Sequence, residues 1–211
     1  MKKVAVSIHA KEDFTVEILK ELEGFDYIHV DLMDGTFVNN KNKNLGVFKK
    51  IKETYNTPVI AHLMVVNPFD YIDEIINFID IFLFHFEIEG KKDIIIKRVR
   101  DFHKKVGIAI NPDTNINEII SHLKNIDLVL VMSVEPGWSG QNFLIDSIEK
   151  VNALAQYKKK YDFLIDIDGG VNISNAKLLK NTDILTSSSA ILKAEDPNKI
   201  IKLLKFSDEN E

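Results

Sequence analysis

Residues 27–36 combine the pattern of a β-strand with three side chains that can do chemistry. Alternate side chains of a strand point to opposite faces, so His29, Asp31 and Met33 share one face. The other face of this strand is apolar. A buried imidazole or carboxylate costs several kcal/mol unless it is paired or binds a metal. The stretch therefore predicts a buried site in which these polar groups have a partner.

Other strands that the sequence predicts end in comparable side chains. If the strands are parallel and close into a barrel, these ends meet at the active-site face. The side chains concerned are Ser7, His62, Met64, His85, Glu87, Met132, Asp166 and Asp168.

Four of these residues, His29, Asp31, His62 and Asp168, offer two imidazoles and two carboxylates. This ligand set suits one divalent metal ion such as Zn, Fe(II), Mn or Co. The chain has no cysteine, so a thiolate site is excluded. Taken singly, a histidine at a strand end is usually structural, and an aspartate before two glycines usually forms a turn. Four such groups at the ends of three strands favour a metal site.

Two stretches have the composition of a phosphate site. Gly169 and Gly170 precede an expected helix, and Ser188 and Ser189 follow the last expected strand. The loops after strands seven and eight of a (β/α)8 barrel often bind phosphate. In another fold, the same residues would be explained as tight turns. The two arginines of the chain, Arg98 and Arg100, lie together in a helical pattern, so backbone N–H groups, helix N-termini or a metal must hold an anion.

Gly137, Trp138, Ser139 and Gly140 form a loop with glycine at both ends. Such bracketing is typical of a mobile lid. The structural alternative is an ordinary surface loop with one packed tryptophan.

Short apolar runs alternate with amphipathic segments along the whole chain. We expect strands at residues 3–8, 27–33, 58–64, 81–86, 106–110, 128–133, 163–167 and 184–187. We expect helices at residues 15–22, 46–53, 67–78, 91–104, 116–123, 145–159, 174–179 and 198–204, with Asp13 and Asn67 as N-caps and a polar loop at 39–44.

Eight successive strand–helix units without a linker predict an α/β fold, a single (β/α)8 TIM barrel. The barrel is expected to span residues 1–206 and to be followed by a frayed polar tail at 207–211. The alternative, an open doubly wound sheet, needs a G-x-G-x-x-G motif after the first strand. Residues 7–10 read Ser-Ile-His-Ala instead.

Composition excludes several classes of partner. The chain has 211 residues, of which 45% are hydrophobic, which is enough for one sizeable core. A net charge of −5 argues against nucleic acid as the main partner. No run approaches the roughly 20 apolar residues of a membrane span, and the N-terminal apolar run is too short for a signal peptide. We therefore expect a cytoplasmic protein without a nucleic-acid or membrane partner.

Four motifs resemble the ribulose-phosphate 3-epimerase family. They are His-Val-Asp-Leu-Met-Asp-Gly (29–35), His-Leu-Met (62–64), Met-Ser-Val-Glu-Pro-Gly-Trp-Ser-Gly-Gln (132–141) and Asp-Gly-Gly (168–170). The match runs in order over nearly the whole chain. The resemblance implies a ribulose-phosphate-binding barrel, a homo-oligomer and a sugar-phosphate substrate.

The resemblance also implies roles for individual residues. One divalent metal would be bound by His29, Asp31, His62 and Asp168, with Asp31 and Asp168 as the catalytic acid/base pair. The substrate would be contacted by Ser7, His62, residues Gly137, Trp138, Ser139 and Gly140 of the covering loop, and Gly169, Gly170, Ser188 and Ser189 at the phosphate. Support is expected from Met33, Met64 and Met132 as a polarizable wall, and from His85 and Glu87 behind the metal ligands.

The reaction implied is the interconversion of D-ribulose 5-phosphate and D-xylulose 5-phosphate through a metal-stabilised enediolate. Several residues depart from the family pattern where the substrate would be shaped, and an epimerase of a six-carbon ketose 6-phosphate, such as allulose 6-phosphate, is therefore the alternative. The departures are His9 in place of leucine, Ile60 in place of aspartate, the asparagine-rich 39–44, Trp138 and Ser139 in place of phenylalanine and glycine, and Ser188 in place of glycine.

Two further classes are disfavoured by particular residues. A lyase of the related phosphate-binding barrels would carry an Asp-x-Lys-x-x-Asp motif at the third strand, where residues 60–66 contain neither lysine nor acid. A non-catalytic sugar-phosphate binder would lack at least one metal ligand or carboxylate, and all four are present.

Overall fold

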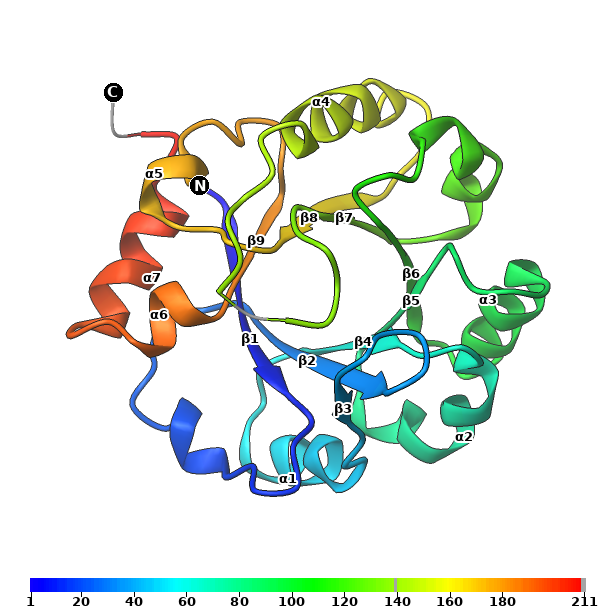
Figure 1. Ribbon diagram of the computed structural model, residues 1–211, viewed down its shortest axis with the longest axis horizontal. Coiled ribbons are helices and arrows are strands. Elements are labelled where there is room, and N and C mark those ends of the chain that lie inside the picture. Colours follow the sequence, from blue (N-terminus) through cyan, green and yellow to red (C-terminus); the bar gives the residue numbers. More distant parts are fainter. Residues whose placement is uncertain (139, 210–211) are drawn as a thin grey trace.

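The computed structural model describes residues 1–138 and 140–209. Within this part of the chain, eight parallel strands close into a barrel because β1 pairs with both β2 and β9. Figure 1 shows the strands as a ring with the helices around it. The prediction of a TIM barrel is confirmed. The barrel strands are β1 (Lys3–His9), β2 (Tyr27–Asp34), β4 (Val59–Met64), β5 (Ile81–His85), β6 (Lys105–Ile110), β7 (Leu128–Met132), β8 (Leu164–Asp168) and β9 (Ile184–Ser187).

Four regular helices cover the outside of the ring: α1 (Gly46–Thr54), α3 (Lys92–Asp101), α4 (Ser147–Tyr157) and α7 (Pro197–Lys205). The other connections are short turns of helix. They are the 3-10 turns Val16–Leu19, Pro68–Tyr71, Ile76–Phe78, Ile116–Glu118 and Ile120–Asn125, and the α-turns α2 (Ile72–Ile75), α5 (Ile173–Ala176) and α6 (Ser189–Leu192).

Three segments that were expected to form regular α-helices do not. The segments expected at 15–22 and 116–123 are 3-10 turns, and the one expected at 67–78 is broken into three. These segments are rich in β-branched residues and too short to sustain α-helix by propensity. Of the expected caps, Asp13 is wrong, because the first turn follows Thr15. Asn67 does occupy the N-cap position of its turn, but its side chain makes no capping bond to any described residue.

The core has two layers that meet at the barrel wall. An outer layer of aliphatic side chains, including Val30 and Phe84, packs between the strands and the surrounding helices. A second layer fills one end of the barrel interior and includes Tyr27, Ile60 and Leu130. Ile60, the departure from the family pattern on β4, belongs to this apolar layer and lies two residues before the inward-facing His62. The interior is apolar at one end and polar at the other.

A short strand interrupts the polar loop that was expected at 39–44. Strand β3 (Lys41–Asn42) pairs antiparallel with the end of β2, opposite Met33 and Asp34. The backbone N–H of Asn44 also donates to the carbonyl of Ala10, and its amide donates to the carbonyl of Lys11. The asparagine-rich segment thus holds the loop after β1 against the mouth of the barrel.

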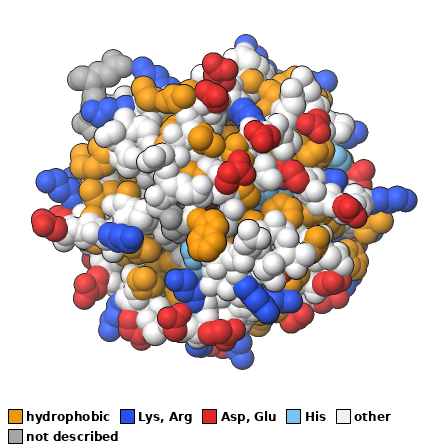
Figure 2. All heavy atoms as spheres, viewed as in Figure 1, with side chains coloured by type: hydrophobic (Ala, Val, Ile, Leu, Met, Phe, Trp, Pro, Cys, Tyr) orange, Lys and Arg blue, Asp and Glu red, His pale blue; other side chains and the backbone are white. Residues whose placement is uncertain are grey.

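The tail expected to fray at 207–211 lies partly outside the described residues. Of its described members, Ser207 is buried and Asp208 forms a salt bridge with Lys2. Charged side chains of both signs are scattered around the face seen in Figure 2, with hydrophobic side chains dispersed among them. No helix in residues 1–138 and 140–209 is long and apolar enough to cross a membrane.

Candidate active site

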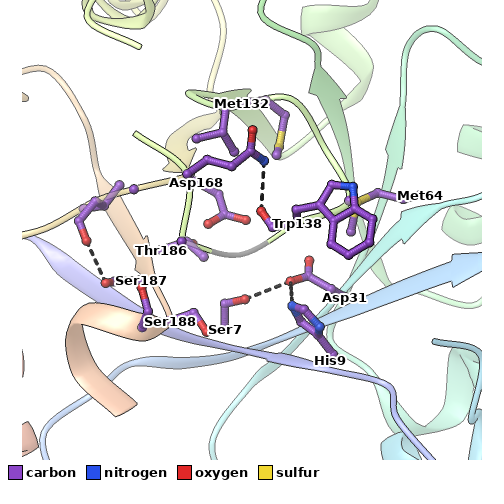
Figure 3. A pocket seen from close by; sticks show the side chains of 18 of the residues that line it. Ser7, His9, Asp31, Met64, Met132, Trp138, Asp168, Thr186, Ser187 and Ser188 are labelled. Carbon is purple, nitrogen blue, oxygen red and sulfur yellow. Dashed lines mark hydrogen bonds and ion pairs between the residues drawn. The ribbon is translucent and has the colours of Figure 1, made fainter. Parts of the chain in front are cut away.

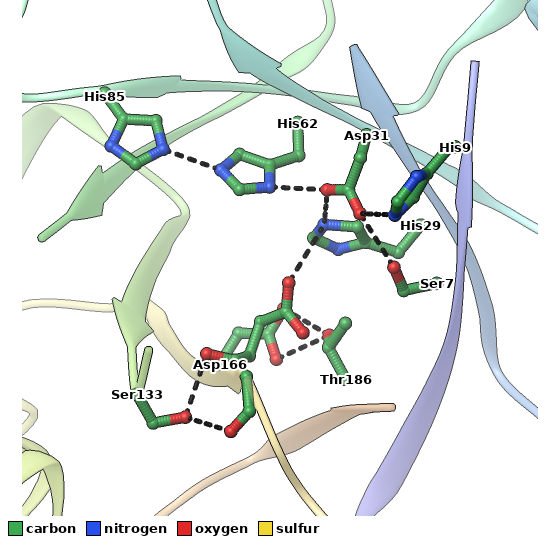
Figure 4. A network of polar contacts seen from close by, with 11 residues as sticks. Ser7, His9, His29, Asp31, His62, His85, Ser133, Asp166 and Thr186 are labelled. Carbon is green, nitrogen blue, oxygen red and sulfur yellow. Dashed lines mark hydrogen bonds and ion pairs between the residues drawn. The ribbon is translucent and has the colours of Figure 1, made fainter. Parts of the chain in front are cut away.

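The polar end of the barrel interior holds a continuous cluster of buried side chains. Each one comes from an inward-facing position near the carboxyl end of a strand, as the alternation of β2 predicts. Figure 4 shows this cluster. Its fully or almost fully buried members are Ser7, His29, Asp31, His62, His85, Asp166 and Thr186.

Asp31 lies at the centre of the cluster. Its Oδ1 atom is 3.2 Å from Nε2 of His29 and 2.8 Å from Nδ1 of His62. Its Oδ2 atom accepts a hydrogen bond of 2.9 Å from the hydroxyl of Ser7. Nε2 of His29 is 3.9 Å from Oδ2 of Asp168, so His29 lies between the two carboxylates.

The structure brings together the four residues proposed to bind a metal. Atoms of His29, Asp31, His62 and Asp168 that could serve as ligands all lie within 4.8 Å of one another. Imidazole and carboxylate are the ligand types of Zn, Fe(II), Mn and Co sites, and three of the four side chains are buried while Asp168 is partly exposed to the pocket. The residues present therefore fit a divalent metal.

The protonation of this cluster reflects the crowding of acidic groups. Burial works against a charged His29, but the carboxylates of Asp31, Asp168 and Asp166 outweigh it and raise the pKa of His29 to about 9. Burial and the neighbouring Asp31 raise the pKa of Asp168 to about 7. The pKa of Asp31 falls well below its usual range, because the two histidines overcome the effect of burial. Without a metal, the imidazolium of His29 supplies the positive charge between the carboxylates.

His62 is in the form that a metal ligand needs. Burial lowers its pKa to about 4, with His85 and His29 acting in the same direction against the opposing effect of Asp31. A neutral imidazole has a free lone pair for a metal. By contrast, Nδ1 of His29 is buried without a hydrogen-bond partner among the described residues.

Asp166 lies one layer deeper than Asp168 on β8 and is fully buried. The hydroxyl of Thr186 lies 2.9 and 3.0 Å from its two carboxylate oxygens. Burial raises the pKa of Asp166 to about 8, so this group holds a proton at neutral pH. Its contact with Thr186 on β9 was not anticipated from the sequence.

A pocket opens above the cluster, and Asp31 and Asp168 point into it from different sides (Figure 3). Most of the residues proposed to contact substrate line this pocket. They are Ser7, Gly137, Trp138, Gly140, Gly169, Gly170, Ser188 and Ser189, together with the proposed supporting residues Met33, Met64 and Met132. Three other described residues with a proposed contact or supporting role do not line the pocket. His62, His85 and Glu87 lie behind its wall.

Gly169 and Gly170 are required by the close packing of the loop after β8. Their φ angles are +118° and +64°, which favour glycine. A Cβ on Gly169 would lie 2.5 Å from a methyl carbon of Val134, and one on Gly170 would lie 2.8 Å from the carbonyl oxygen of Gln141. Ser133 was missed by sequence reasoning, yet its hydroxyl lies within hydrogen-bond distance of the carbonyl oxygens of Asp168 and Gly169, at 2.9 and 2.7 Å.

The glycine-bracketed loop between β7 and α4 lies over the mouth of the barrel (Figure 1). Trp138 is 60% exposed although it lines the pocket. The amide of Asn40 ties the loop to the segment after β2 by donating to the carbonyl of Gly137, and within the loop the amide of Gln141 donates to the carbonyl of Trp138. The predicted contact of Ser139 lies outside the described residues.

Comparisons with known proteins agree on one family. The family model described as the ribulose-phosphate 3 epimerase family matches residues 3–192. The chain is 37% identical over 194 residues to a ribulose-phosphate 3-epimerase of Methanocaldococcus jannaschii. The alignment covers 90% of this chain and 82% of the relative. It is 33% identical over 200 residues to the protein of the same name from Chlamydia pneumoniae, with 90% and 87% covered.

Solved structures show the same fold at low sequence identity. The 3-keto-L-gulonate-6-phosphate decarboxylase of Vibrio cholerae superposes with a TM-score of 0.72 at 10% identity, covering 98% of this chain and 96% of that one. The 3-hexulose-6-phosphate synthase of Salmonella typhimurium gives a TM-score of 0.70 at 15% identity, with 97% of each chain covered. The fold is thus shared with synthases and decarboxylases, and the sequence match separates this chain from them. The chain belongs to the ribulose-phosphate 3-epimerase family and is an isomerase, a carbohydrate-phosphate epimerase.

Proposed function

We propose that this enzyme is a metal-dependent 3-epimerase that interconverts D-ribulose 5-phosphate and D-xylulose 5-phosphate. The observation that carries the proposal is the placement of Asp31 and Asp168. They reach the same pocket from β2 and β8, point into it from different sides, and have His29 between them. Two carboxylates that approach one carbon from two sides are what an inversion by proton transfer needs.

The reaction removes the proton on C3, which is acidic because C3 lies next to the C2 carbonyl, and returns a proton to the opposite face. One aspartate acts as the base and the other, protonated, as the acid, and their roles exchange with the direction of reaction. The raised pKa of Asp168, about 7, and the depressed pKa of Asp31 suit such a pair, because Asp168 can gain or lose a proton near neutral pH while Asp31 is ionised. The two carboxyls are expected to titrate together.

A divalent metal held by His29, Asp31, His62 and Asp168 would supply a Lewis acid that stabilises negative charge on the oxygens at C2 and C3. Ser7 donates to Asp31 and keeps one of its oxygens oriented toward the pocket. The thioethers of Met33, Met64 and Met132 line the pocket and exclude water from the reacting carbon.

The phosphate would lie against Gly169, Gly170, Ser188 and Ser189, which line one side of the same pocket. Glycines let the backbone N–H groups approach an anion closely, and the serines add hydroxyl donors. The homo-oligomer implied by the family resemblance stays a prediction.

The proposal is tested by assaying the purified protein with D-ribulose 5-phosphate, with and without a chelator. Allulose 6-phosphate is assayed in parallel, because the pocket continues past His9 and Trp138 into a wider surface groove that could hold a longer substrate. Chelator-sensitive formation of D-xylulose 5-phosphate supports the proposal. Turnover of the hexose alone would keep the mechanism and change the substrate, and turnover of neither by metal-loaded protein would contradict the assignment.

His9 is the departure from the family pattern that lies nearest the reacting groups. It lines the pocket, with Nε2 3.9 Å from Oδ2 of Asp31 and Nδ1 3.5 Å from the amide nitrogen of Asn42 on β3. We expect His9→Leu to lower kcat/KM by about 10- to 100-fold, mainly through KM, because a hydrogen bond to a substrate hydroxyl is lost. Steady-state kinetics measure the change. His122→Leu, on the outer surface, is the control, and equal kinetics for the two variants would remove His9 from the substrate site.

A further inference from the structure

A line of hydrogen bonds runs from Asp31 away from the pocket, across β4 and β5, to the loop after β6. Nε2 of His62 is 2.9 Å from Nε2 of His85, and Nδ1 of His85 is 3.2 Å from Oε2 of Glu87. Figure 4 shows the part of this line from Asp31 through His62 to His85. Both histidines are fully buried, so water does not compete for their ring nitrogens. We refer to His62, His85 and Glu87 as the relay.

The far end of the relay is fixed in place. Oε1 of Glu87 accepts from the backbone N–H of Asn111 at 2.7 Å and from the hydroxyl of Thr114. The ammonium group of Lys150, on α4, lies 3.2 Å from the carbonyl of Asn111 and 2.6 Å from that of Thr114. The loop after β6 therefore holds Glu87 from behind, and Glu87 has one oxygen left for His85.

The hydrogen-bond polarity of the relay follows from its end group. A carboxylate only accepts, so Nδ1 of His85 carries the proton that faces Glu87. In neutral His85, Nε2 is then an acceptor, and it receives the N–H of Nε2 from His62. Neutral His62 is left with a lone pair on Nδ1. This lone pair points at a carboxylate oxygen of Asp31 only 2.8 Å away, and two acceptors at this distance need a cation beside them.

We propose that Glu87 is a positioning residue that, through His85, sets the tautomer of His62 and so presents its Nδ1 lone pair to the divalent metal. The inference rests on the metal site of the proposed function and adds two residues to it. Carboxylates that orient metal-binding histidines are a recurring feature of metalloenzymes. Here the orientation passes through a second histidine. Among the described residues, the other ligand histidine, His29, has no such partner on Nδ1.

The test is Glu87→Gln, which keeps the shape of the side chain and adds an N–H donor. The glutamine amide can donate to Nδ1 of His85, which reverses the relay and places a proton on Nδ1 of His62. We expect the affinity for Co²⁺ to fall about 10- to 100-fold. Competition with a chelating dye at constant pH measures this without substrate, and the visible absorption of bound Co²⁺ reports the ligand set.

Asp93→Asn is the matched control. Asp93 pairs with Nδ1 of His122 at 3.2 Å, the same distance as in the Glu87–His85 pair, on the outer surface. The control should leave the affinity unchanged. A folded Glu87→Gln protein that binds Co²⁺ as tightly as wild type would overturn this inference and leave the proposed metal dependence in place. Wild-type protein that binds no Co²⁺ would overturn it together with the proposed metal dependence.

A second measurement does not depend on how the variant folds. Nitrogen-15 NMR of the Zn²⁺-loaded wild-type protein distinguishes the two histidine tautomers. We expect the ring proton of His62 on Nε2. A ring proton on Nδ1 would show that the relay runs in the opposite direction and would refute the role of Glu87.

Discussion

Replacing Asp168 by asparagine is expected to lower epimerase turnover by at least about 10³-fold, within the range that a lost acid/base group accounts for. The amide neither takes up nor delivers the proton at C3, and it removes one negative charge from the metal ligands. The fold should persist, because asparagine has almost the same shape and Asp168 lies at the mouth of the barrel rather than in its packed layer. Turnover and circular dichroism of the purified variant check both statements.

The matched control is Asp166→Asn on the same face of β8. Asp166 lies outside the pocket lining among the described residues, and its contacts are to the hydroxyl of Thr186, which an amide can retain. Because Asp166 is already protonated at neutral pH, the exchange changes little charge. We expect it to keep turnover within about tenfold of wild type, well above the loss for a removed acid/base group. Wild-type turnover in Asp168→Asn together with loss in Asp166→Asn would transfer the acid/base role to Asp166.

The barrel and the central cluster can be predicted from the sequence, because they depend on the alternation of side chains within single strands. A period of two along β2 places His29 and Asp31 on one face whatever the neighbouring strands do. Parallel closure then brings His62 and Asp168 beside them, since all strand ends meet at one face. The apolar outer face of each strand made the existence of the barrel predictable, and the expected strands differ from the observed ones only at their ends.

The parts that were missed depend on contacts between distant segments. Strand β3 forms because residues 41–42 meet the end of β2, and the polar sequence there carries no strand pattern of its own. The hydrogen bonds of Ser133 to Asp168 and of Thr114 to Glu87 join consecutive strand units and become visible only once the barrel is closed. His85 and Glu87 were expected to support the metal ligands, but their order in the relay required the geometry.

Removal of the divalent metal is the second change that we expect to lower epimerase activity strongly. Protein dialysed against a chelator should lose epimerase activity to the assay background, because the four side chains that converge within 4.8 Å of one another would hold the ion at the reacting groups. Zn²⁺, Co²⁺, Mn²⁺ or Fe²⁺ should restore activity better than Mg²⁺, since two of the four ligands are imidazoles. Mg²⁺-treated protein is the matched control for ionic strength and charge.

The same ion should stabilise the fold. An ion that binds only the native state at 100 times its Kd adds about 2.7 kcal/mol to the free energy of unfolding. The melting temperature should therefore rise when metal is returned to the stripped protein, and the rise should be absent in a His29→Ala, His62→Ala double variant. Stripped protein with full activity and an unchanged melting temperature would show that the four residues form a hydrogen-bonded cluster in its own right. In that case the imidazolium of His29, whose pKa is raised to about 9, would supply positive charge beside the two carboxylates.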